Sequence, residues 1–389
     1  MDLSYIINEL GEERAAYFNS VAPPIIQASN FSFNTVEALG KAFEDEMSGY
    51  LYSRGLNPTV DILRKKLAAL DGAEDCLVFN SGAAAIFAGV LANVKAGDHL
   101  VSVSRPYTWA QKMFDVILPR FGVTTSYVDG TTLDSWQQAT RPNTSFYYLE
   151  SPNSWNFSLQ PIREVAAFAK GRGITTLIDN SYCTPLYQPV IEMGIDLAMQ
   201  TATKYIGGHS DTLGGVLCGS YSRMKKIFDS EYLNVGSGIQ PFNAWLLLRG
   251  LRTLPMRLQR IFQSTATVLE GLKQHPAVES VIFPLDKNFP QFELASRQMK
   301  GAGGLLTFTL ATTSREQIVR FAESLQHILM AVSWGGHESL IIPKCAGIPE
   351  KDFNPQNPEH RMVRLYVGLE DPGYLLDDLY RALERSGNW

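Results

Sequence analysis

The stretch TATKYIGGHSD, residues 201–211, contains one lysine among hydroxyls and glycines. The apolar run before it, residues 195–199, predicts a short buried strand. Lys204 therefore follows the end of a strand in an open α/β sheet, at the edge where such sheets bind ligands. A desolvated amine there can form a Schiff base. Since most lysines are ordinary surface residues, this interpretation needs a second group.

Asp179 supplies that second group. It ends another apolar strand pattern, TLIDN at residues 176–180, one crossover upstream of Lys204. A lysine that holds an aldehyde cofactor and an aspartate that keeps a pyridine nitrogen protonated are the two groups that pyridoxal phosphate needs from a protein. A turn or capping role is the alternative for Asp179.

Further motifs surround this pair: IDNSYCTP, YSRGLNPT, SGAAAI, SWGGHESL and RLYVGLED. Together they resemble the pyridoxal-phosphate enzymes of cysteine and methionine metabolism, the trans-sulfuration family, from about Pro23 to the C-terminal helix. Within that family SGAAAI, LESPNS, RGLRTL and above all SWGGHESL look most like bacterial cystathionine β-lyase. The resemblance implies pyridoxal 5′-phosphate (PLP) as cofactor and the aspartate aminotransferase-like fold of type I PLP-dependent transferases.

Length and composition restrict the class of protein. With 389 residues, of which 45% are apolar, the chain is long enough for two domains and an arm. The net charge is −5 and the basic residues are scattered, so a nucleic-acid partner is not expected. The N-terminus lacks the regions of a signal peptide, and no run approaches the ~18 apolar residues of a membrane span. These features predict a cytoplasmic protein without a membrane partner.

The cysteines and histidines show no metal-binding spacing. His209 and His337 lie in glycine-containing turns, where a structural hydrogen bond is the expected role. We predict no metal. The cysteines lack CxxC spacing and adjoin apolar stretches, which is typical of reduced thiols, at Cys76, Cys183, Cys218 and Cys345.

Residues 1–58 predict an arm that ends in YLYSRG, where Tyr52 and Arg54 point the same way if the segment is extended. An arginine fork beside a phenol suits a phosphate, and a loop with a surface arginine is the alternative. The resemblance implies that both side chains reach the cofactor phosphate of a neighbouring subunit. It also implies a homotetramer built from two such dimers.

Residues 59–240 predict the large domain. Strand patterns at 76–79, 99–103, 123–128, 146–149 and 174–178 alternate with helical patterns at 108–121, at 162–170 and in an Ala-rich helix through Val94. This alternation predicts a mostly parallel sheet covered by helices on both faces.

The turn Ser81-Gly82-Ala83 opens the Ala-rich helix. Free N–H groups and the helix dipole favour an anion there, and glycine lets the backbone approach it. A simple helix cap is the alternative. The resemblance implies that this turn holds the cofactor phosphate and that Thr201 and Thr203 add hydroxyls to it.

Tyr107 matches the family tyrosine that stacks on the pyridine ring. The resemblance places it, with Lys204 and Tyr52, among the catalytic side chains. Relatives outside the β-lyase group often have glycines after this tyrosine, where this chain has Trp109. Relatives also often have an asparagine near the ring hydroxyl, where this chain has Ser154.

Residues 241–389 predict a smaller α/β domain with strands at 305–310, 330–333 and 363–367. Ser333, Trp334 and Arg364 are expected at strand ends. The alternation around Arg364 predicts a half-buried guanidinium that needs an anionic partner. That partner is either a structural carboxylate such as Glu370 or, as the resemblance implies, the α-carboxylate of a substrate near Ser333 and Trp334.

The resemblance implies a carbon–sulfur lyase of methionine biosynthesis in which Lys204 takes the Cα proton. Trp334, the LESPNS turn and Trp109 favour a site walled by aromatic side chains, and hence β-elimination of cystathionine to homocysteine, pyruvate and ammonia. The main alternative is γ-elimination or γ-replacement, as in cystathionine γ-lyase, methionine γ-lyase, cystathionine γ-synthase or O-acetylhomoserine sulfhydrylase. Val332 favours neither, because it stands where γ enzymes often carry glutamate and bacterial β-lyases often carry tyrosine.

Two further alternatives are weaker. An aminotransferase would use the same cofactor. A dinucleotide-binding module is the weakest alternative, because no G-x-G-x-x-G follows the early strands.

Overall fold

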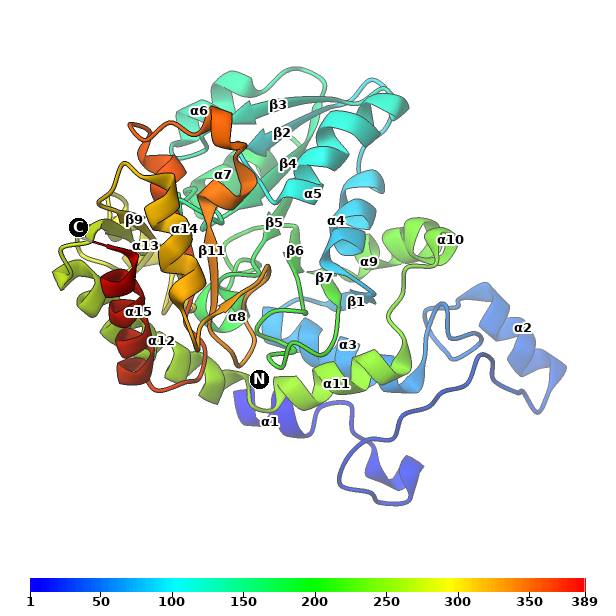
Figure 1. Cartoon of the computed structure of the whole chain (residues 1–389). Helices are drawn as coiled ribbons and strands as arrows, with labels where there is room; N and C mark the ends of the chain where they lie inside the picture. Colours follow the sequence, from blue (N-terminus) through cyan, green and yellow to red (C-terminus); the bar gives the residue numbers. More distant parts are fainter. Residues whose placement is uncertain (388) are drawn as a thin grey trace. The chain divides into compact units, whose positions relative to one another are not determined.

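The structure is a computed structural model that describes residues 1–387 and 389. The chain divides into two compact units (Figure 1). Unit 1 comprises Met1–Ser151, Leu159–Gly207 and Asp211–Thr253, and unit 2 comprises Pro152–Ser158, Gly208–Ser210 and Leu254–Trp389. Two helices follow one another near the boundary of the units, α11 (Pro241–Leu251) and α12 (Leu254–Gln274). The division between the units falls in the turn between them, and α11 belongs to unit 1.

Unit 1 is organised around a seven-stranded sheet with the strand order β1-β7-β6-β5-β4-β2-β3. The pairing is parallel from β3 to β6, and β7 runs antiparallel to both of its neighbours. This confirms the predicted mostly parallel sheet. The sequence did not reveal β7, because this short segment begins and ends with glycine. The strands are β1 (Asp75–Phe79), β2 (His99–Val103), β3 (Thr124–Val128), β4 (Thr144–Glu150), β5 (Thr175–Asp179), β6 (Leu197–Gln200) and β7 (Gly215–Gly219).

Helices cover both faces of this sheet, because successive side chains of a strand point to opposite faces. On one face, Leu77 and Leu217 join the main hydrophobic cluster with Ile86 of α4 (Gly82–Leu91). On the other face, the Cys218 thiol lies 3.8 Å from the Leu67 carbonyl oxygen of α3 (Pro58–Asp71). Other helices of unit 1 are α6 (Leu133–Ala139), α7 (Ile162–Gly171), α8 (Thr184–Tyr187), α9 (Tyr221–Ile227) and α10 (Leu233–Val235).

The helix predicted at residues 108–121 is irregular. It begins as α5 (Thr108–Lys112), continues as a π-helical turn, η2 (Met113–Ile117), and ends as a 3₁₀ turn, η3 (Leu118–Phe121). π-Helical turns are rare and frequently occur at functional sites.

A buried ion cluster fixes the start of the chain. Lys66 of α3 has 1% of its side chain exposed, and its Nζ donates to the carbonyl oxygens of Ile6 and Ile7 in α1 (Leu3–Asn8) at 3.0 Å. The same Nζ lies 3.0 Å from Glu12 Oε1, to which Arg252 donates at 2.8 Å. Separating these groups would leave a buried charge without its partner, which is costly. The contacts therefore hold residues 1–12 against α3.

The segment that follows exposes large apolar side chains. It contains η1 (Arg14–Tyr17) and α2 (Val36–Glu44), and α2 lies at the right-hand edge of Figure 1. Phe18 is 99% exposed, Val36 is 87% exposed and Phe43 is 66% exposed. Such a group of exposed apolar side chains is typical of a surface that another chain covers. The contribution of this arm to a neighbouring subunit stays a prediction.

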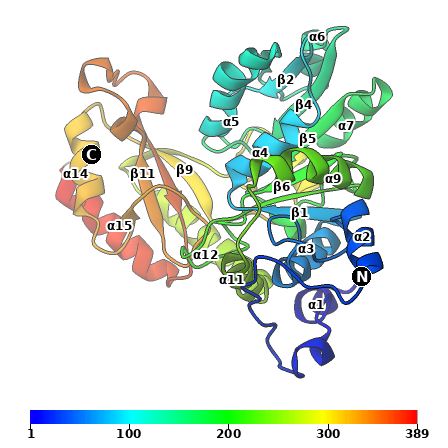
Figure 2. The same cartoon turned by 90° about the vertical axis from the view of Figure 1, so that its right-hand side faces the viewer.

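Unit 2 contains a five-stranded sheet with the order β10-β11-β12-β9-β8. In Figure 2, α14 lies beside β11 and α15 of the same unit. The helices of unit 2 are α12, α13 (Phe292–Gln298), α14 (Arg315–Ser324) and α15 (Pro372–Ser386). Its strands are β8 (Val278–Ile282), β9 (Leu305–Leu310), β10 (Leu329–Met330), β11 (Leu340–Pro343) and β12 (Met362–Tyr366).

Two sequence predictions for unit 2 are wrong. The strand predicted at residues 330–333 ends at Met330, and Ser333 has a φ of 82°, which lies outside the β region. Arg364 lies in the middle of β12, opposite Thr307 and Ile342, and not at a strand end.

One buried carboxylate of unit 1, that of Asp71 at the end of α3, forms no ion pair with any residue that the structure describes. Gln200 Nε2 donates to Asp71 Oδ2 at 2.6 Å. Burial raises the pKa of Asp71 to about 7, although hydrogen bonds from Cys218 and Gln200 oppose the rise. Gln200 ends β6 and precedes Thr201, so this bond anchors the strand that leads to Lys204.

We predict that Asp71 makes unit 1 less stable as the pH rises. Its pKa is about 7 when folded against 3.8 in the reference state, so the folded protein binds the proton more tightly and loses stability between those two values. Asp71→Asn removes this loss. The variant's free energy of unfolding minus that of wild type should therefore be larger, and the variant relatively more stable, at pH 8 than at pH 5 by about 2–3 kcal/mol.

Chemical denaturation at equal protein concentration at the two pH values is the measurement. Asp377→Asn is the control, because the Asp377 side chain is 70% exposed. Parallel pH dependence of wild type and Asp71→Asn would contradict the prediction.

Candidate active site

Parallel strands of unit 1 bring the candidate residues to one edge of its sheet. β4 ends at Glu150, which is in register with Asp179 at the end of β5, and Asp179 is opposite Met199 of β6. Tyr107 follows β2, and its N–H donates to Glu150 Oε2 at 2.6 Å. Lys204 follows β6. Ligands of open α/β sheets bind at this carboxyl edge.

Asp179 places a carboxyl group at this edge of the sheet. It is 9% exposed. Burial raises its pKa, while hydrogen bonds from Ser181 and the positive charge of Lys204 oppose the rise. The two ionisable groups that the sequence singled out therefore interact, and the carboxylate is placed to stabilise a further positive charge.

Ser181 is a site residue that the sequence analysis missed. Its N–H donates to Asp179 Oδ1 at 2.9 Å, and its Oγ accepts a hydrogen bond from the Thr201 N–H at 2.7 Å. Ser181 thus joins the end of β5 to the loop that carries Lys204. The available signal was its position two residues after Asp179, because aspartate side chains often bind the N–H two residues on.

Tyr107 lies half-exposed at the start of α5. Burial and the charges of Asp179 and Glu150 raise the pKa of its phenol. The hydroxyl therefore stays protonated at neutral pH and can donate a proton.

The turn before α4 has the properties of an anion site. Ser81 caps the helix, its Oγ accepting a hydrogen bond from the Ala84 N–H at 3.2 Å. The first N–H groups of the helix, those of Gly82 and Ala83, have no acceptor within the helix. A Cβ at Gly82 would lie 2.2 Å from Thr201 Oγ1, so only glycine fits and the Thr201 hydroxyl faces the turn. An anion is stabilised at such a helix start.

Thr203 is placed differently. Its Oγ1 accepts a hydrogen bond from the Gly214 N–H at 3.1 Å and lies 3.4 Å from the Gly214 carbonyl oxygen. Its predicted bond to the phosphate stays a prediction.

These groups fit pyridoxal 5′-phosphate. A buried carboxylate suits a protonated ring nitrogen, an amine interacts with that carboxylate, and a helix start with an adjoining hydroxyl suits a phosphate.

Tyr52 and Arg54 line a polar pocket of about 450 Å³ in unit 1. The Arg54 guanidinium carbon lies 5.7 Å from the centre of the Tyr52 ring. The described lining of this pocket contains none of the other candidate cofactor residues. This separation supports, without testing, the prediction that the two side chains serve another subunit.

Arg364 of unit 2 is a desolvated cation. Burial lowers its pKa to about 10. Its Nη1 donates to Ser154 Oγ at 3.3 Å, and within residues 1–387 and 389 it has no carboxylate partner. Glu370, the structural alternative, instead accepts hydrogen bonds from the Ser339 N–H and Oγ at 2.7 and 2.8 Å. Arg364 is therefore suited to an external anion.

Ser333 and Trp334 are half-buried in unit 2. The positive φ of Ser333, 82°, is rare for a residue other than glycine, and such strain is concentrated at functional sites. Val332 is 81% exposed. The substrate roles of Ser333 and Trp334 stay predictions.

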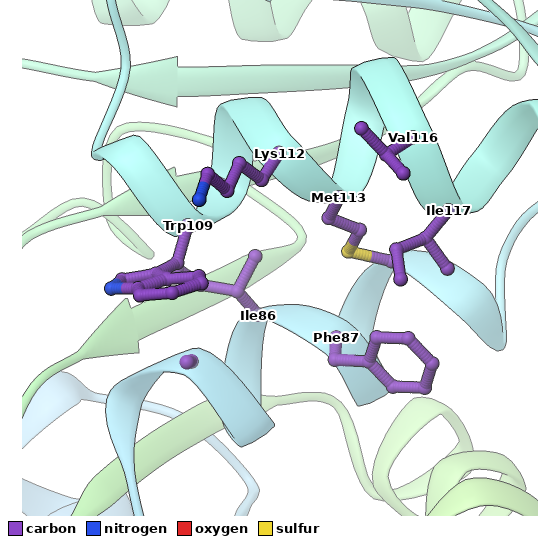
Figure 3. A pocket seen from close by; sticks show the side chains of 9 residues that line it. Ile86, Phe87, Trp109, Lys112, Met113, Val116 and Ile117 are labelled. Atoms are coloured by element: carbon purple, nitrogen blue, oxygen red, sulfur yellow. The ribbon is translucent and has the colours of Figure 1, made fainter.

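Trp109 lines an apolar pocket of about 410 Å³ with Ile86, Phe87 and Met113 (Figure 3). The Lys112 ammonium lies 4.7 Å from the centre of its ring. The described lining includes Ala83 of the turn before α4, Ala110, Val116 and Ile117, and it includes none of Lys204, Asp179 and Tyr107. The expected contribution of Trp109 to a wall around the cofactor stays a prediction.

Within residues 1–387 and 389, no group of three or more His, Cys, Asp or Glu side chains is arranged to hold a metal ion. None of the helices there has the length and apolar character needed to cross a membrane. The four cysteines are buried and free.

Comparison with known proteins gives one family over nearly the whole chain. Residues 5–384 match the family described as "Cys/Met metabolism PLP-dependent enzyme". An L-methionine gamma-lyase of Treponema denticola is 35% identical over 95% of this chain and 93% of its own length. A cystathionine gamma-lyase of Bacillus subtilis is 31% identical over 96% of each chain. An O-succinylhomoserine sulfhydrylase of Pseudomonas aeruginosa is 32% identical over 92% of this chain and 90% of its own length.

We predict that Arg54 and Lys204 of different subunits form one site. Arg54→Ala and Lys204→Ala should each lack most activity alone. When the two chains are co-assembled, activity should return to about one quarter of the wild-type value per subunit, because half of randomly formed dimers carry one complete site out of two. Refolding the mixed chains and assaying them is the measurement. A mixture no more active than either variant would show that the site lies within one subunit.

Proposed function

Because this chain belongs to the Cys/Met metabolism PLP-dependent enzymes, whose cofactor is pyridoxal 5′-phosphate, we propose that it is a carbon–sulfur lyase that releases a thiol from the γ-carbon of an amino acid such as methionine or cystathionine. The observation that carries an amino-acid substrate is Arg364, a desolvated guanidinium without a carboxylate partner among the described residues. The α-carboxylate of the substrate is the anion that we assign to it.

The choice of the γ-carbon replaces the preference for cystathionine β-lyase that the sequence alone suggested. That preference depended partly on an aromatic wall, and Trp109 lies in a pocket that shares only Ala83 with the candidate cofactor residues. Two of the relatives compared above are named γ-lyases. Val332 does not enter the choice, because it is neither the tyrosine of bacterial β-lyases nor the glutamate of many γ enzymes.

The cofactor would be held by residues of unit 1. Ser81, Gly82, Ala83 and Thr201 would bind its phosphate, with Thr203 as a further hydroxyl. Asp179 would bind the ring nitrogen, Tyr107 would lie on the ring and Lys204 would bind the aldehyde carbon. Tyr52 and Arg54 of a second subunit would complete the phosphate site.

When bound, the cofactor withdraws electrons from the carbon atoms beside the substrate nitrogen. Asp179 sustains this effect, because a buried carboxylate stabilises a positive charge on the ring nitrogen. γ-Elimination requires removal of protons from Cα and then from Cβ, and the Lys204 amine is the base assigned to both transfers.

Tyr107 is assigned to the departing thiolate. Its phenol stays protonated at neutral pH, because burial and the carboxylates of Asp179 and Glu150 raise its pKa. It can therefore donate a proton to sulfur as the Cγ–S bond breaks. Arg364 holds the substrate carboxylate and so fixes the orientation of the Cα–H bond.

γ-Replacement is the second candidate. The relative from Pseudomonas aeruginosa is named O-succinylhomoserine sulfhydrylase, so a thiol acceptor reaction by the same residues belongs with the proposal. We also assign the protein to the cytoplasm, which the four buried, free cysteines support, and to a homotetramer.

The product of the reaction tests the proposal. We predict that the purified protein converts L-cystathionine mainly to 2-oxobutyrate and free cysteine, and L-methionine to 2-oxobutyrate and methanethiol, because both reactions break the bond between Cγ and sulfur. Lys204→Ala is the control and should lower the rate by at least about 10²-fold, the range for loss of a general base. Chromatography of the keto acids is the measurement.

Dominant pyruvate and homocysteine from L-cystathionine would contradict γ-elimination and restore β-elimination. Faster formation of a thioether from an activated homoserine ester and a thiol would favour the sulfhydrylase alternative.

A further inference from the structure

Trp155 is a half-buried side chain that contacts two cations. It lies in residues 152–158, which belong to unit 2. The Arg364 guanidinium carbon lies 5.3 Å from the centre of its ring, and the Lys344 ammonium lies 4.9 Å from it. Both distances are within the range of cation–π attraction.

The two cations have different partners. Lys344 Nζ lies 3.2 Å from Glu359 Oε2, so a carboxylate balances its charge. Arg364 has the Ser154 hydroxyl at 3.3 Å and the Trp155 ring, and no carboxylate in the described chain. A guanidinium has five N–H donors, and one hydroxyl cannot fix its plane. The indole face of Trp155 offers an extended surface against the guanidinium.

We propose that Trp155 is a positioning residue that holds the Arg364 guanidinium by its indole face in the orientation that binds the substrate carboxylate. This inference rests on the proposed function, in which Arg364 binds that carboxylate. The indole attracts the cation without neutralising it, whereas a carboxylate at the same place would occupy the donors that the substrate needs.

Desolvation strengthens the effect. The Arg364 side chain is half-buried, and burial lowers its pKa to about 10. Cation–π attraction is larger for a desolvated cation than for an exposed one. Without the indole, water would reach the guanidinium and the Arg364 side chain would adopt other orientations. Both changes would weaken its bond to a carboxylate.

A purely structural role would be to pack residues 152–158 in place. That role would affect every ligand of the site equally. The positioning role affects only ligands with a carboxylate, so a pair of ligands that differ in this group distinguishes the two.

The test measures binding in the Lys204→Ala background, which removes turnover. The probes are L-methionine and 3-(methylthio)propylamine, the same molecule without the carboxylate, and calorimetry gives their dissociation constants. Trp155→Leu should raise the dissociation constant of L-methionine by about 3- to 30-fold, the range that corresponds to cation–π attraction. It should leave the dissociation constant of the amine within about twofold of its original value. Trp155→Phe should recover most of the lost affinity, because a phenyl face retains the attraction.

Asn156→Ala is the matched control. It removes the 3.2 Å bond that the Ser158 N–H donates to Asn156 Oδ1, and so perturbs the same loop. It should change the dissociation constant of neither ligand. Trp155→Met replaces Trp155→Leu if the leucine variant does not fold.

The outcomes separate this inference from the proposed function. If Arg364→Ala does not weaken the binding of L-methionine, Arg364 does not bind the substrate carboxylate, and the inference fails with that assignment. If Arg364→Ala weakens the binding of L-methionine but Trp155→Leu does not, the inference alone is overturned. Equal weakening of both ligands by Trp155→Leu, or no recovery with Trp155→Phe, would also overturn it.

Discussion

The carboxylate of Asp179 is buried at the end of a parallel strand, and the rest of the unit 1 site depends on this constraint. A buried carboxylate is stable as an anion only where donors and positive charge surround it. Here Ser181 donates to it from 2.9 Å, and Lys204 acts on it through its charge. A protonated pyridine nitrogen is a further positive group of the kind that this carboxylate stabilises.

The parallel arrangement of the strands explains why the other residues meet Asp179. The carboxyl ends of β4, β5 and β6 lie at one edge, so the residues that follow them share that edge although they are far apart in the chain. Ser181 fixes the spacing by binding Asp179 on one side and Thr201 on the other. Unit 2 follows the opposite principle, because Arg364 is a half-buried cation that the described chain leaves without a carboxylate.

Patterns that depend on local periodicity could be predicted from the sequence. The strand at residues 99–103 was predicted with its observed bounds. Asp179 lies at the end of β5, as its apolar run predicted, and Lys204 follows β6 in the loop after Gln200. The antiparallel strand β7 was not predicted, since its five residues begin and end with glycine.

Features that depend on contacts between distant residues could not be predicted. The contact of Trp155 with Arg364 joins residues that lie far apart in the chain. The motif LESPNS, which directly precedes Trp155, gives no sign of this contact. The strand predicted at residues 330–333 failed at Ser333, because a positive φ in a serine is imposed by its surroundings and not by its own preference.

The central claim is that Lys204 is the residue that binds the cofactor. The most direct measurement is to reduce the purified holoenzyme with sodium borohydride, digest it and locate the pyridoxyl group by peptide mass spectrometry. This account predicts the added mass on the peptide that contains Lys204 and on no other lysine. A pyridoxyl group on any other lysine would contradict it.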